Sequence, residues 1–458
     1  MMQPVILLAR PPFAAPGGAP TPPPEPAGDW LGRLETGVLR LRLLLHISRT
    51  TGGPWRATFD SLDQNASGIP IAAVTIEGGH LRLDVPVAHA SYEGDVRGDS
   101  IAGTWTQGGA SLPLVFDRVT AGSALPSTRR PQDPVEPYPY RADEVSYENR
   151  QAGIRLAGTL TVPPGAGPFP AAILITGSGP QDRDETVFGH RPFLVLADHL
   201  TRHGLAVLRS DDRGEGRSGG TFKGATSADF ATDVEAALAW LETRPEIDRR
   251  RIGLVGHSEG GLIAPMVAAT HPEVAFLVLW AAPGVPGDDL LVEQVRRLML
   301  ARGKTAAEAD RAADDERAVV DVVKRGAIRA VLDAELRGRV PPGQMEALLK
   351  AAESPWFRYF LTCDPALALR RVRCPVLAIT GSRDVQAPAD QNLPAIRRAL
   401  DAGGNRQITI EEMPGLNHLL QTAQTGDVNE YAAIDETIAP AALEAIASWI
   451  RAQVEAGA

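Results

Sequence analysis

Apolar and polar residues alternate along the first quarter of the chain. Leu39–Leu43 and His80–Val85 place an apolar side chain at every second position. Side chains two apart in a strand lie on the same face of a sheet, so each such strand has one buried face and one solvated face. Turn residues, such as those in Glu77–His80, separate the alternating runs and favour tight hairpins. The expected strands are Trp30–Leu34, Val38–Arg49, Trp55–Ser61, Ile69–Glu77, His80–Val85, Ala88–Val96, Ser100–Gln107 and Ala110–Arg118.

The segment 29–120 is therefore predicted to be an antiparallel, barrel-like domain. About eight short strands suit a small barrel, because closing the sheet removes its open edges. No polar cluster in the segment resembles a catalytic site. We expect an accessory domain with a solid core, and rank a barrel that binds an apolar ligand second.

From residue 141 onward, short apolar runs alternate with helical stretches. Such alternation is typical of a mostly parallel, doubly wound α/β sheet with helices on both faces. The expected strands are Ile154–Val162, Ala171–Thr176, Leu205–Arg209, Ile252–Val255, Val274–Ala281, Pro375–Thr380 and Gln407–Glu411. The expected helices are Arg191–His203, Ala228–Glu242, Gly260–Thr270 and Pro440–Val454.

The alternation stops after residue 281. Residues 287–362 have a helical pattern rich in Ala, Arg and Glu, with aromatic residues such as Trp356 and Phe360 near the end. We expect a helical cap over residues 287–370, inserted after the strand that follows the candidate nucleophile. Its aromatic residues are interpreted as core packing ahead of pocket lining.

Two proline-rich segments mark the expected domain boundaries. Residues 1–28 are predicted to be a disordered N-terminus, residues 121–140 a linker and residues 141–458 the α/β domain. Val5–Ala9 is a short apolar run without the basic flank of a signal peptide. The location in the cell stays open, with export to the periplasm or the medium ranked ahead of the cytoplasm.

Composition excludes several classes of protein. The 458 residues suffice for two or three domains, and 46 basic against 56 acidic residues give a net charge of -10, which argues against a nucleic-acid partner. No run approaches the roughly 20 apolar residues that span a bilayer. Cys363 and Cys374 are the 2 cysteines, which excludes a disulfide framework or a cysteine-rich zinc site. We expect a small-molecule substrate and no metal or other cofactor, and leave a homo-oligomer open.

The segment Gly256–Gly261, Gly-His-Ser-Glu-Gly-Gly, is the most informative motif. It follows an apolar strand and precedes a helical stretch. A serine on such a strand-to-helix turn exposes its hydroxyl, and the next backbone amide can stabilise an oxyanion. Ser258 is therefore predicted to be a nucleophile, with an ordinary strand–helix turn as the alternative. A second Gly-x-Ser-x-Gly match, at Ser218, lies in a charged glycine-rich run without a following helix and is ranked below it.

A serine nucleophile on such a strand-to-helix turn, known as a nucleophile elbow, needs a histidine as its base. In α/β-sheet enzymes of this kind, the histidine follows both the serine and the acid along the chain. Only His271 and His418 follow Ser258. His271 ends the helix that begins at the serine, so it is expected to point away. His418 lies in a loop just beyond a predicted strand, and we predict it as the base.

The acid of such a site comes between the serine and the histidine. Asp384 directly follows the predicted strand Pro375–Thr380, which puts a carboxylate at the carboxyl end of that strand. It is preferred to Asp390, which is expected on the next helix, and to Glu411, which is expected inside a strand.

The glycine-rich turn after Ala171–Thr176 is predicted to complete an oxyanion hole. The amide of Ser178 or Gly179 would join that of Glu259, with Ser178 preferred and a plain tight turn as the alternative. The charged run Arg209–Ser218 is expected to pair its charges with one another and to brace the loops beneath the site, with a substrate-binding arginine as the less favoured alternative.

These motifs carry a resemblance. Residues 141–458 resemble the α/β-hydrolase superfamily, and within it bacterial carboxylesterases, several of which have a β-rich N-terminal extension. The motifs that carry the likeness are Gly177–Asp184, Asp211–Ser218, Gly256–Gly261 and Leu416–Leu419. The resemblance implies hydrolysis of short-chain acyl esters by Ser258, Asp384 and His418. One departure is Thr176, where many members have His, which removes a side chain that can support the loop.

We therefore expect a serine hydrolase that cleaves carboxylic esters of short to medium acyl chains through an acyl-enzyme. A serine at position 258 argues against the dehalogenase and epoxide-hydrolase chemistries of this superfamily, which use Asp there. A serine peptidase of the aminopeptidase or acyl-peptide hydrolase type is the alternative, and would need a carboxylate for a free amino terminus, for which Glu259 is one candidate. A non-catalytic ligand-binding protein is the remoter alternative.

Overall fold

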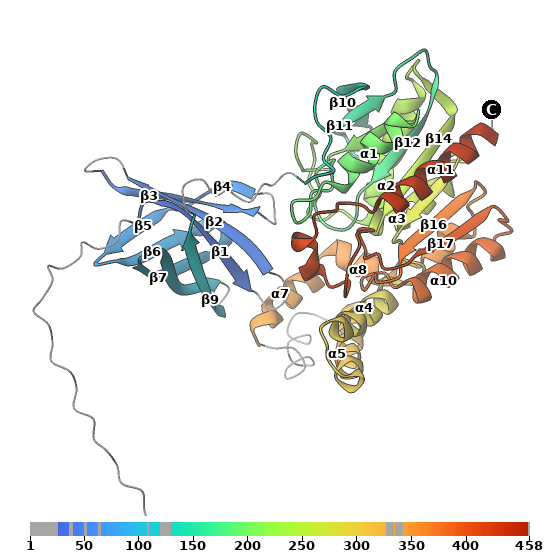
Figure 1. Ribbon diagram of the computed structural model, residues 1–458. Helices are drawn as coiled ribbons and strands as arrows, with labels where there is room; N and C mark the ends of the chain where they lie inside the picture. The colour runs from blue at the N-terminus through green and yellow to red at the C-terminus, as the bar shows by residue number, and fades with distance from the viewer. Residues whose placement is uncertain are drawn as a thin grey trace, which may run out of the picture.

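The structure, a computed structural model, describes residues 26–456 apart from 36–39, 50–52, 63–65, 108–109, 120–129, 327–333 and 335–341. The described chain forms two β-sheets, which Figure 1 shows in two lobes, the N-terminal one in blue. The predicted disordered N-terminus up to residue 25, and residues 121–129 of the predicted linker, lie outside the described residues.

The N-terminal sheet is antiparallel throughout, and its described strands follow the order β4-β3-β2-β1-β9-β8-β7-β6-β5. It curls like half a barrel (Figure 1), which confirms the barrel-like antiparallel domain predicted from the alternation. The strands are β1 (Gly28–Glu35), β2 (Arg40–Arg49), β3 (Trp55–Ser61), β4 (Ala66–Pro70), β5 (Ala73–Glu77), β6 (His80–Val85), β7 (Ala90–Arg97), β8 (Ser100–Gln107) and β9 (Ala110–Arg118).

The predicted strand Ile69–Glu77 is two strands in the structure. β4 pairs with β3 at one end of the sheet, whereas β5 pairs with β6 at the other end. Pro70 is the last residue of β4, and a proline cannot donate a ladder hydrogen bond because it has no amide hydrogen. The chain leaves the first edge at this point, so one continuous apolar run supplies both end strands.

Aromatic side chains fill the buried face of this sheet. Phe59 packs edge-on against Trp105, with ring centroids 5.8 Å apart, and Tyr92 packs edge-on against Phe116 at 5.3 Å. The buried hydroxyl of Tyr92 donates to two main-chain carbonyl groups at 3.1 Å. The inside of the curl is therefore occupied by the domain's own side chains.

The second sheet has the strand order β10-β11-β13-β12-β14-β15-β16-β17. β11 runs antiparallel to both of its neighbours, and the other pairs are parallel. This order is that of an α/β-hydrolase sheet and confirms the predicted fold class. The strands are β10 (Arg141–Asn149), β11 (Ile154–Val162), β12 (Phe169–Ile175), β13 (Ala206–Ser210), β14 (Ile247–His257), β15 (Leu277–Trp280), β16 (Val376–Gly381) and β17 (Ile408–Met413).

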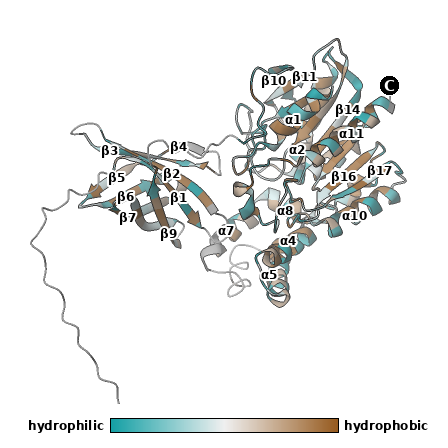
Figure 2. Cartoon of the chain, viewed as in Figure 1, coloured by the Kyte–Doolittle hydropathy of each residue, from teal (hydrophilic) through white to brown (hydrophobic). Residues whose placement is uncertain are grey.

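Helices cover both faces of this sheet, so its central strands are buried on both sides. Figure 2 shows these hydrophobic strands in brown between the helices. Among the described helices, none combines the length and apolar content that crossing a bilayer requires. One face carries α1 (Pro192–Arg202) and α11 (Pro440–Ala456), and the other carries α2 (Ser227–Glu242), α3 (Glu259–Ala268) and α10 (Ala389–Ala402).

The interval between β15 and β16 is helical and occupies the position predicted for the cap. Its helices include α4 (Gly287–Ala301), α5 (Ala306–Lys324), α7 (Pro342–Ala352), α8 (Pro355–Thr362) and α9 (Pro365–Leu369). Val320 and Leu361 belong to a core that these helices form among themselves. A second cluster joins Phe360 of α8 to Leu262 of α3. The cap therefore rests on the helix that begins just after Ser258.

The second half of the predicted linker is anchored to the α/β domain. The guanidinium group of Arg130 donates to the carbonyl oxygens of Phe188, Ala432 and Ile434 at 2.8–3.0 Å. These bonds hold residues 130–140 against the segment that leads into α11.

Candidate active site

Ser258 lies at the turn between β14 and α3. Its backbone has φ 52° and ψ −117°, a conformation that residues other than glycine rarely adopt. Neighbouring glycines let the turn close: a Cβ atom on Gly256 would overlap the main chain of Gly260, and one on Gly260 would overlap the carbonyl of Ile175. The sharp turn leaves the Ser258 residue half-buried at the carboxyl end of the sheet.

Asp384 and His418 form a buried, hydrogen-bonded pair. Nδ1 of His418 donates to Oδ2 of Asp384 at 2.8 Å. The other carboxylate oxygen, Oδ1, accepts the amides of Gln386 and Ala387, both at 2.8 Å. Because Nδ1 is engaged and the carboxylate is held at both oxygens, His418 has only Nε2 left for a further partner.

His257, which precedes Ser258, contacts the chain segment that carries His418. The two imidazole centroids lie 4.8 Å apart, and Nε2 of His257 lies 3.3 Å from the carbonyl oxygen of His418. The indole of Trp280 donates to the same carbonyl at 3.2 Å. These contacts bring residue 418 next to the residue that precedes Ser258. Within the described residues, no hydrogen bond joins the Ser258 hydroxyl to the His418 imidazole.

The loop after β12 lies against the candidate nucleophile. A Cβ atom on Gly177 would lie 3.3 Å from the Cβ atom of Ser258. In the described part of the chain, no hydrogen bond uses the amides of Ser178, Gly179 or Glu259. Glu259 is the first residue of α3, whose amide has no partner within the helix. The predicted oxyanion residues therefore have amides available, and their role stays a prediction.

Glu185 is a buried residue of this region that the sequence analysis missed. Its Oε1 accepts the amide of Gly177 at 2.6 Å and Nδ1–H of His257 at 2.8 Å. Glu185 itself has a positive φ of 52°. It ties the loop after β12 to the elbow. Two features of the sequence could have pointed to Glu185: it is an acid in the loop after β12, and a histidine lies inside Gly256–Gly261.

Asp212 supports the same loop. Its Oδ1 accepts the hydroxyl of Thr176 at 2.8 Å, and its Oδ2 accepts the amide of Gln181 at 3.0 Å. The pKa of Asp212 is raised to about 8, with burial as the main cause. The charges of Glu185 and Glu259 also raise it, whereas these two hydrogen bonds lower it. Thr176, which stands where many members of the superfamily have His, therefore supports the loop through Asp212.

The charged run Arg209–Ser218 pairs with other segments of the chain, so the predicted pairing within the run is wrong. Asp211 accepts from Arg183, in the loop after β12, at 2.7 and 2.9 Å. Arg213 donates to Asp233 of α2 at 2.7 Å. The reason is spatial: the run lies between these two segments and meets opposite charge on each. The bracing of the loops comes from these bonds.

The alternative site residues lie in other surroundings. The hydroxyl of Ser218 donates to a main-chain carbonyl at 2.8 Å and accepts a main-chain amide at 2.9 Å. Asp390 lies on α10 and pairs with Arg297 at 2.5 Å, and Glu411 is exposed on β17. His271 follows α3 and lies 3.9 Å from Glu235 on α2.

Glu259 joins the elbow to the cap. Its Oε1 accepts the hydroxyl of Ser227 at 2.6 Å and the indole N–H of Trp356 in α8 at 2.8 Å. Burial raises the pKa of this carboxyl, against the lowering effect of Ser227, Trp356 and the Ser178 hydroxyl. Oε2 is buried without a hydrogen-bond partner among the described residues. Phe360 and Trp356 of the cap pack in one hydrophobic cluster, which agrees with the predicted core packing, and Trp356 also donates to Glu259.

Comparison with known proteins gives matches over part of the chain. The family described as Hydrolase_4, serine aminopeptidase S33, matches residues 191–424. "Esterase EstD" of Thermotoga maritima is 26% identical over 285 residues, which cover 62% of this chain and 62% of that esterase, so the chain spans less than two thirds of that relative. An uncharacterized 31.7 kDa protein of Escherichia coli is 26% identical over 246 residues, 52% of this chain and 80% of that protein. Among solved structures, a Pyrococcus furiosus esterase aligns with a TM-score of 0.42 and 18% identity, covering 69% of this chain and 91% of the esterase.

Ser258→Gly and Ser258→Ala both remove the hydroxyl, yet we expect them to differ in stability. Glycine adopts a positive φ freely, whereas alanine keeps a backbone strain of about 1–3 kcal/mol. Glycine also costs about 0.5–1 kcal/mol, because it gives the unfolded chain more conformational entropy. Subtracting this cost from the strain that glycine avoids, we expect Ser258→Gly to be about 1 kcal/mol more stable than Ser258→Ala. Urea unfolding of the two variants measures the difference, and equal free energies of unfolding would contradict the strain at this turn.

Asp212 should make the stability of the protein depend on pH. Its folded pKa of about 8 lies above its ordinary value of 3.8, so between these values the folded state holds a proton that the unfolded state has lost. Stability therefore falls as the pH rises through this window, by up to about 1.4 kcal/mol per pH unit from this group. We expect urea unfolding at pH 5–8 to give a flatter profile for Asp212→Asn, which has no titrating group there. Identical slopes for the variant and the parent protein would refute this.

Proposed function

The chain belongs to the serine aminopeptidase S33 family of hydrolases, and from that premise we propose that Ser258, His418 and Asp384 are the nucleophile, base and acid of an esterase. The observation that carries the proposal is the buried Asp384–His418 hydrogen bond, in a segment that contacts His257 beside the serine. The description of the Thermotoga relative as an esterase supports carboxylic esters as the substrates.

In the first step, His418 accepts the hydroxyl proton of Ser258 at Nε2, because Nδ1 is held by Asp384. The serine oxygen bonds to the carbonyl carbon of the ester, and the carbonyl oxygen becomes an oxyanion. The amide of Glu259, together with that of Ser178 or Gly179, donates hydrogen bonds to this oxyanion. The fixed amides stabilise charge where it develops and need no reorganisation.

In the second step, His418 gives its proton to the alcohol oxygen as the carbon–oxygen bond breaks, which leaves an acyl group on Ser258. A water molecule then attacks the acyl carbon while His418 takes its proton. The bond between the acyl carbon and Oγ of Ser258 breaks, His418 returns the proton to Oγ, and the carboxylic acid is released. Short to medium acyl chains are the proposed substrates, and the chemistry needs no cofactor.

Variants of Ser258, His418 and Asp384 should lose turnover by different amounts. We expect Ser258→Ala to lower kcat by about 10⁶-fold, with no further loss in the double variant with His418→Ala, because the two groups act as a unit. Asp384→Asn should lower kcat by about 10⁴-fold, since the amide no longer holds the required imidazole tautomer. Initial rates on p-nitrophenyl butyrate measure these effects, with Ser218→Ala as the matched serine control.

Substantial esterase activity in Ser258→Ala would end the proposal. A fluorophosphonate probe separates an enzyme from a non-catalytic ligand-binding protein, because only an activated serine reacts with it. Labelling of the parent protein and its loss in Ser258→Ala are the expected results.

An aminopeptidase is the second candidate, and Glu259 is the feature that favours it. Oε2 of Glu259 is a buried acceptor without a partner among the described residues, at the position directly after the serine. A free amino terminus would need this group as a carboxylate. Burial raises the pKa of Glu259 and so disfavours that charged form, which is why the esterase is preferred.

Two p-nitrophenyl esters that differ only in whether the amino group is free distinguish the candidates. An esterase should hydrolyse the p-nitrophenyl esters of alanine and of N-acetylalanine with similar kcat/KM, and should prefer both to alanine p-nitroanilide. An aminopeptidase should require the free amino group and should lose this preference in Glu259→Gln. A strong preference for the free amine, removed in Glu259→Gln, would replace the ester assignment by the peptidase assignment.

A further inference from the structure

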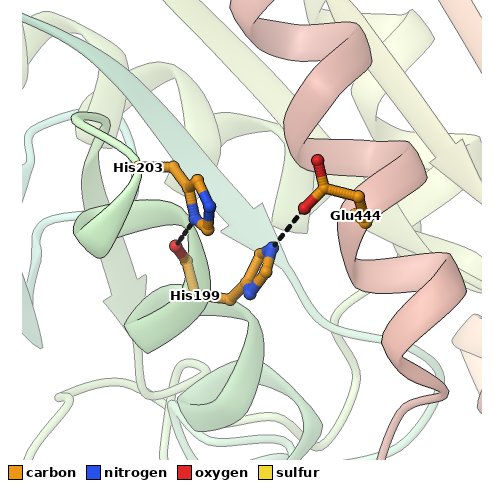
Figure 3. Close-up of side chains that lie close together, drawn as sticks. All are labelled: His199, His203 and Glu444. Atoms are coloured by element: carbon orange, nitrogen blue, oxygen red, sulfur yellow. Dashed lines mark hydrogen bonds and ion pairs between the residues drawn. The ribbon is translucent and has the colours of Figure 1, made fainter.

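Two histidines and a glutamate converge between α1 and α11, outside the catalytic set. His199 and His203 lie four residues apart, at the end of α1 and at its C-terminal cap, so their side chains project from one face. Figure 3 shows both imidazoles and the carboxylate of Glu444 pointing toward one another. Each residue offers one ligand atom, and these atoms lie within 4.8 Å of one another.

The spacing is close to that around a single metal ion. Zn²⁺ lies about 2.0–2.2 Å from histidine nitrogens and carboxylate oxygens and prefers tetrahedral coordination, so two ligand atoms of one ion are about 3.4 Å apart. Nε2 of His199 lies 3.8 Å from Oε2 of Glu444, and the three ligand atoms lie within 4.8 Å of one another. Binding one ion therefore requires the ligand atoms to approach one another by up to about 1.4 Å. The side chains of His203 and Glu444 are exposed, which leaves them room to rotate toward the ion.

A hydrogen bond orients the His203 imidazole for a cation. Nδ1–H of His203 donates to the carbonyl oxygen of His199 at 2.7 Å, which leaves a lone pair on Nε2. Ligating histidines in metalloproteins are oriented by the same kind of bond at their other nitrogen. Nε2 of His199 is buried and has no hydrogen-bond partner among the described residues. A cation bound by this nitrogen would satisfy it, and would lie beside the two rings, because their centroids are only 4.3 Å apart.

We propose that His199, His203 and Glu444 bind one divalent transition-metal ion, with Zn²⁺ the best match. Imidazole nitrogens suit Zn²⁺, Co²⁺ and Ni²⁺, whereas Mg²⁺ and Ca²⁺ prefer oxygen ligands. Three protein ligands leave a further position for water. The ion would join α11, which ends the described chain, to α1 on the same face of the sheet. The proposed hydrolysis does not use it.

Calorimetric titration of the tag-free, chelator-treated protein with Zn²⁺ tests the site. We expect one ion per chain and a higher melting temperature with Zn²⁺, because a ligand at about 100 times its Kd favours the folded state about 100-fold. His203→Ala and Glu444→Gln should each weaken binding by at least about tenfold, since loss of even an outer hydrogen-bond partner of a metal ligand costs about 10–100-fold in affinity. Both residues are exposed, so both variants should fold, which circular dichroism checks.

His271→Ala is the matched control. His271 is a helix-end histidine 3.9 Å from Glu235 on the opposite face of the sheet, with no third ligand in the described part of the chain. The His271→Ala variant should bind Zn²⁺ with the same affinity as the parent protein. The proposal is overturned if the parent protein shows no saturable binding, if Mg²⁺ binds as tightly as Zn²⁺, or if either His203→Ala or Glu444→Gln retains the parent affinity.

Discussion

The close passage of main chains at the turn around Ser258 is the constraint on which the rest of the site depends. The end of β12, the end of β14 and the first turn of α3 approach so closely that Gly256 and Gly260 have no space for a Cβ atom. Within this approach the serine adopts a positive-φ conformation, and the first amide of α3, as in any α-helix, has no partner in the helix. A bulkier motif would push the loop after β12 away, and the predicted oxyanion amides would separate. Packing of backbones, more than any single hydrogen bond, therefore positions the candidate catalytic groups.

Buried carboxyl groups surround this turn, and their environments differ. Asp384 accepts a hydrogen bond from His418, while Glu185 accepts one from His257. Asp212, with a pKa of about 8, is mostly protonated at neutral pH, and burial also raises the pKa of Glu259. A developing oxyanion would be repelled by each carboxylate nearby. Keeping Asp212 neutral, and favouring the neutral form of Glu259, limits that repulsion while their hydrogen bonds still shape the loops.

The sequence was informative where local pattern and chain order determine the outcome. The alternation of strands and helices and the barrel-like domain both follow from the periodicity of apolar residues. The expected chain order of serine, acid and histidine selected Asp384 and His418, which the structure joins by a hydrogen bond. Glu185 was missed because its role depends on a positive φ and on a partner 72 positions away. The partners predicted for Arg209–Ser218 were wrong for a similar reason, since composition alone cannot say which segments pack on either side of a run.

The hydrogen bond between Trp356 and Glu259 links the helical segment between β15 and β16 to the start of α3. Trp356 lies on α8 and Glu259 follows the candidate nucleophile, so an outward movement of α8 would withdraw a proton donor from a buried acid beside Ser258. The acid would then hold its proton more firmly, and the first turn of α3 would lose one of its fixed contacts. A displacement that begins in the outer helices would in this way be transmitted to the turn at Ser258.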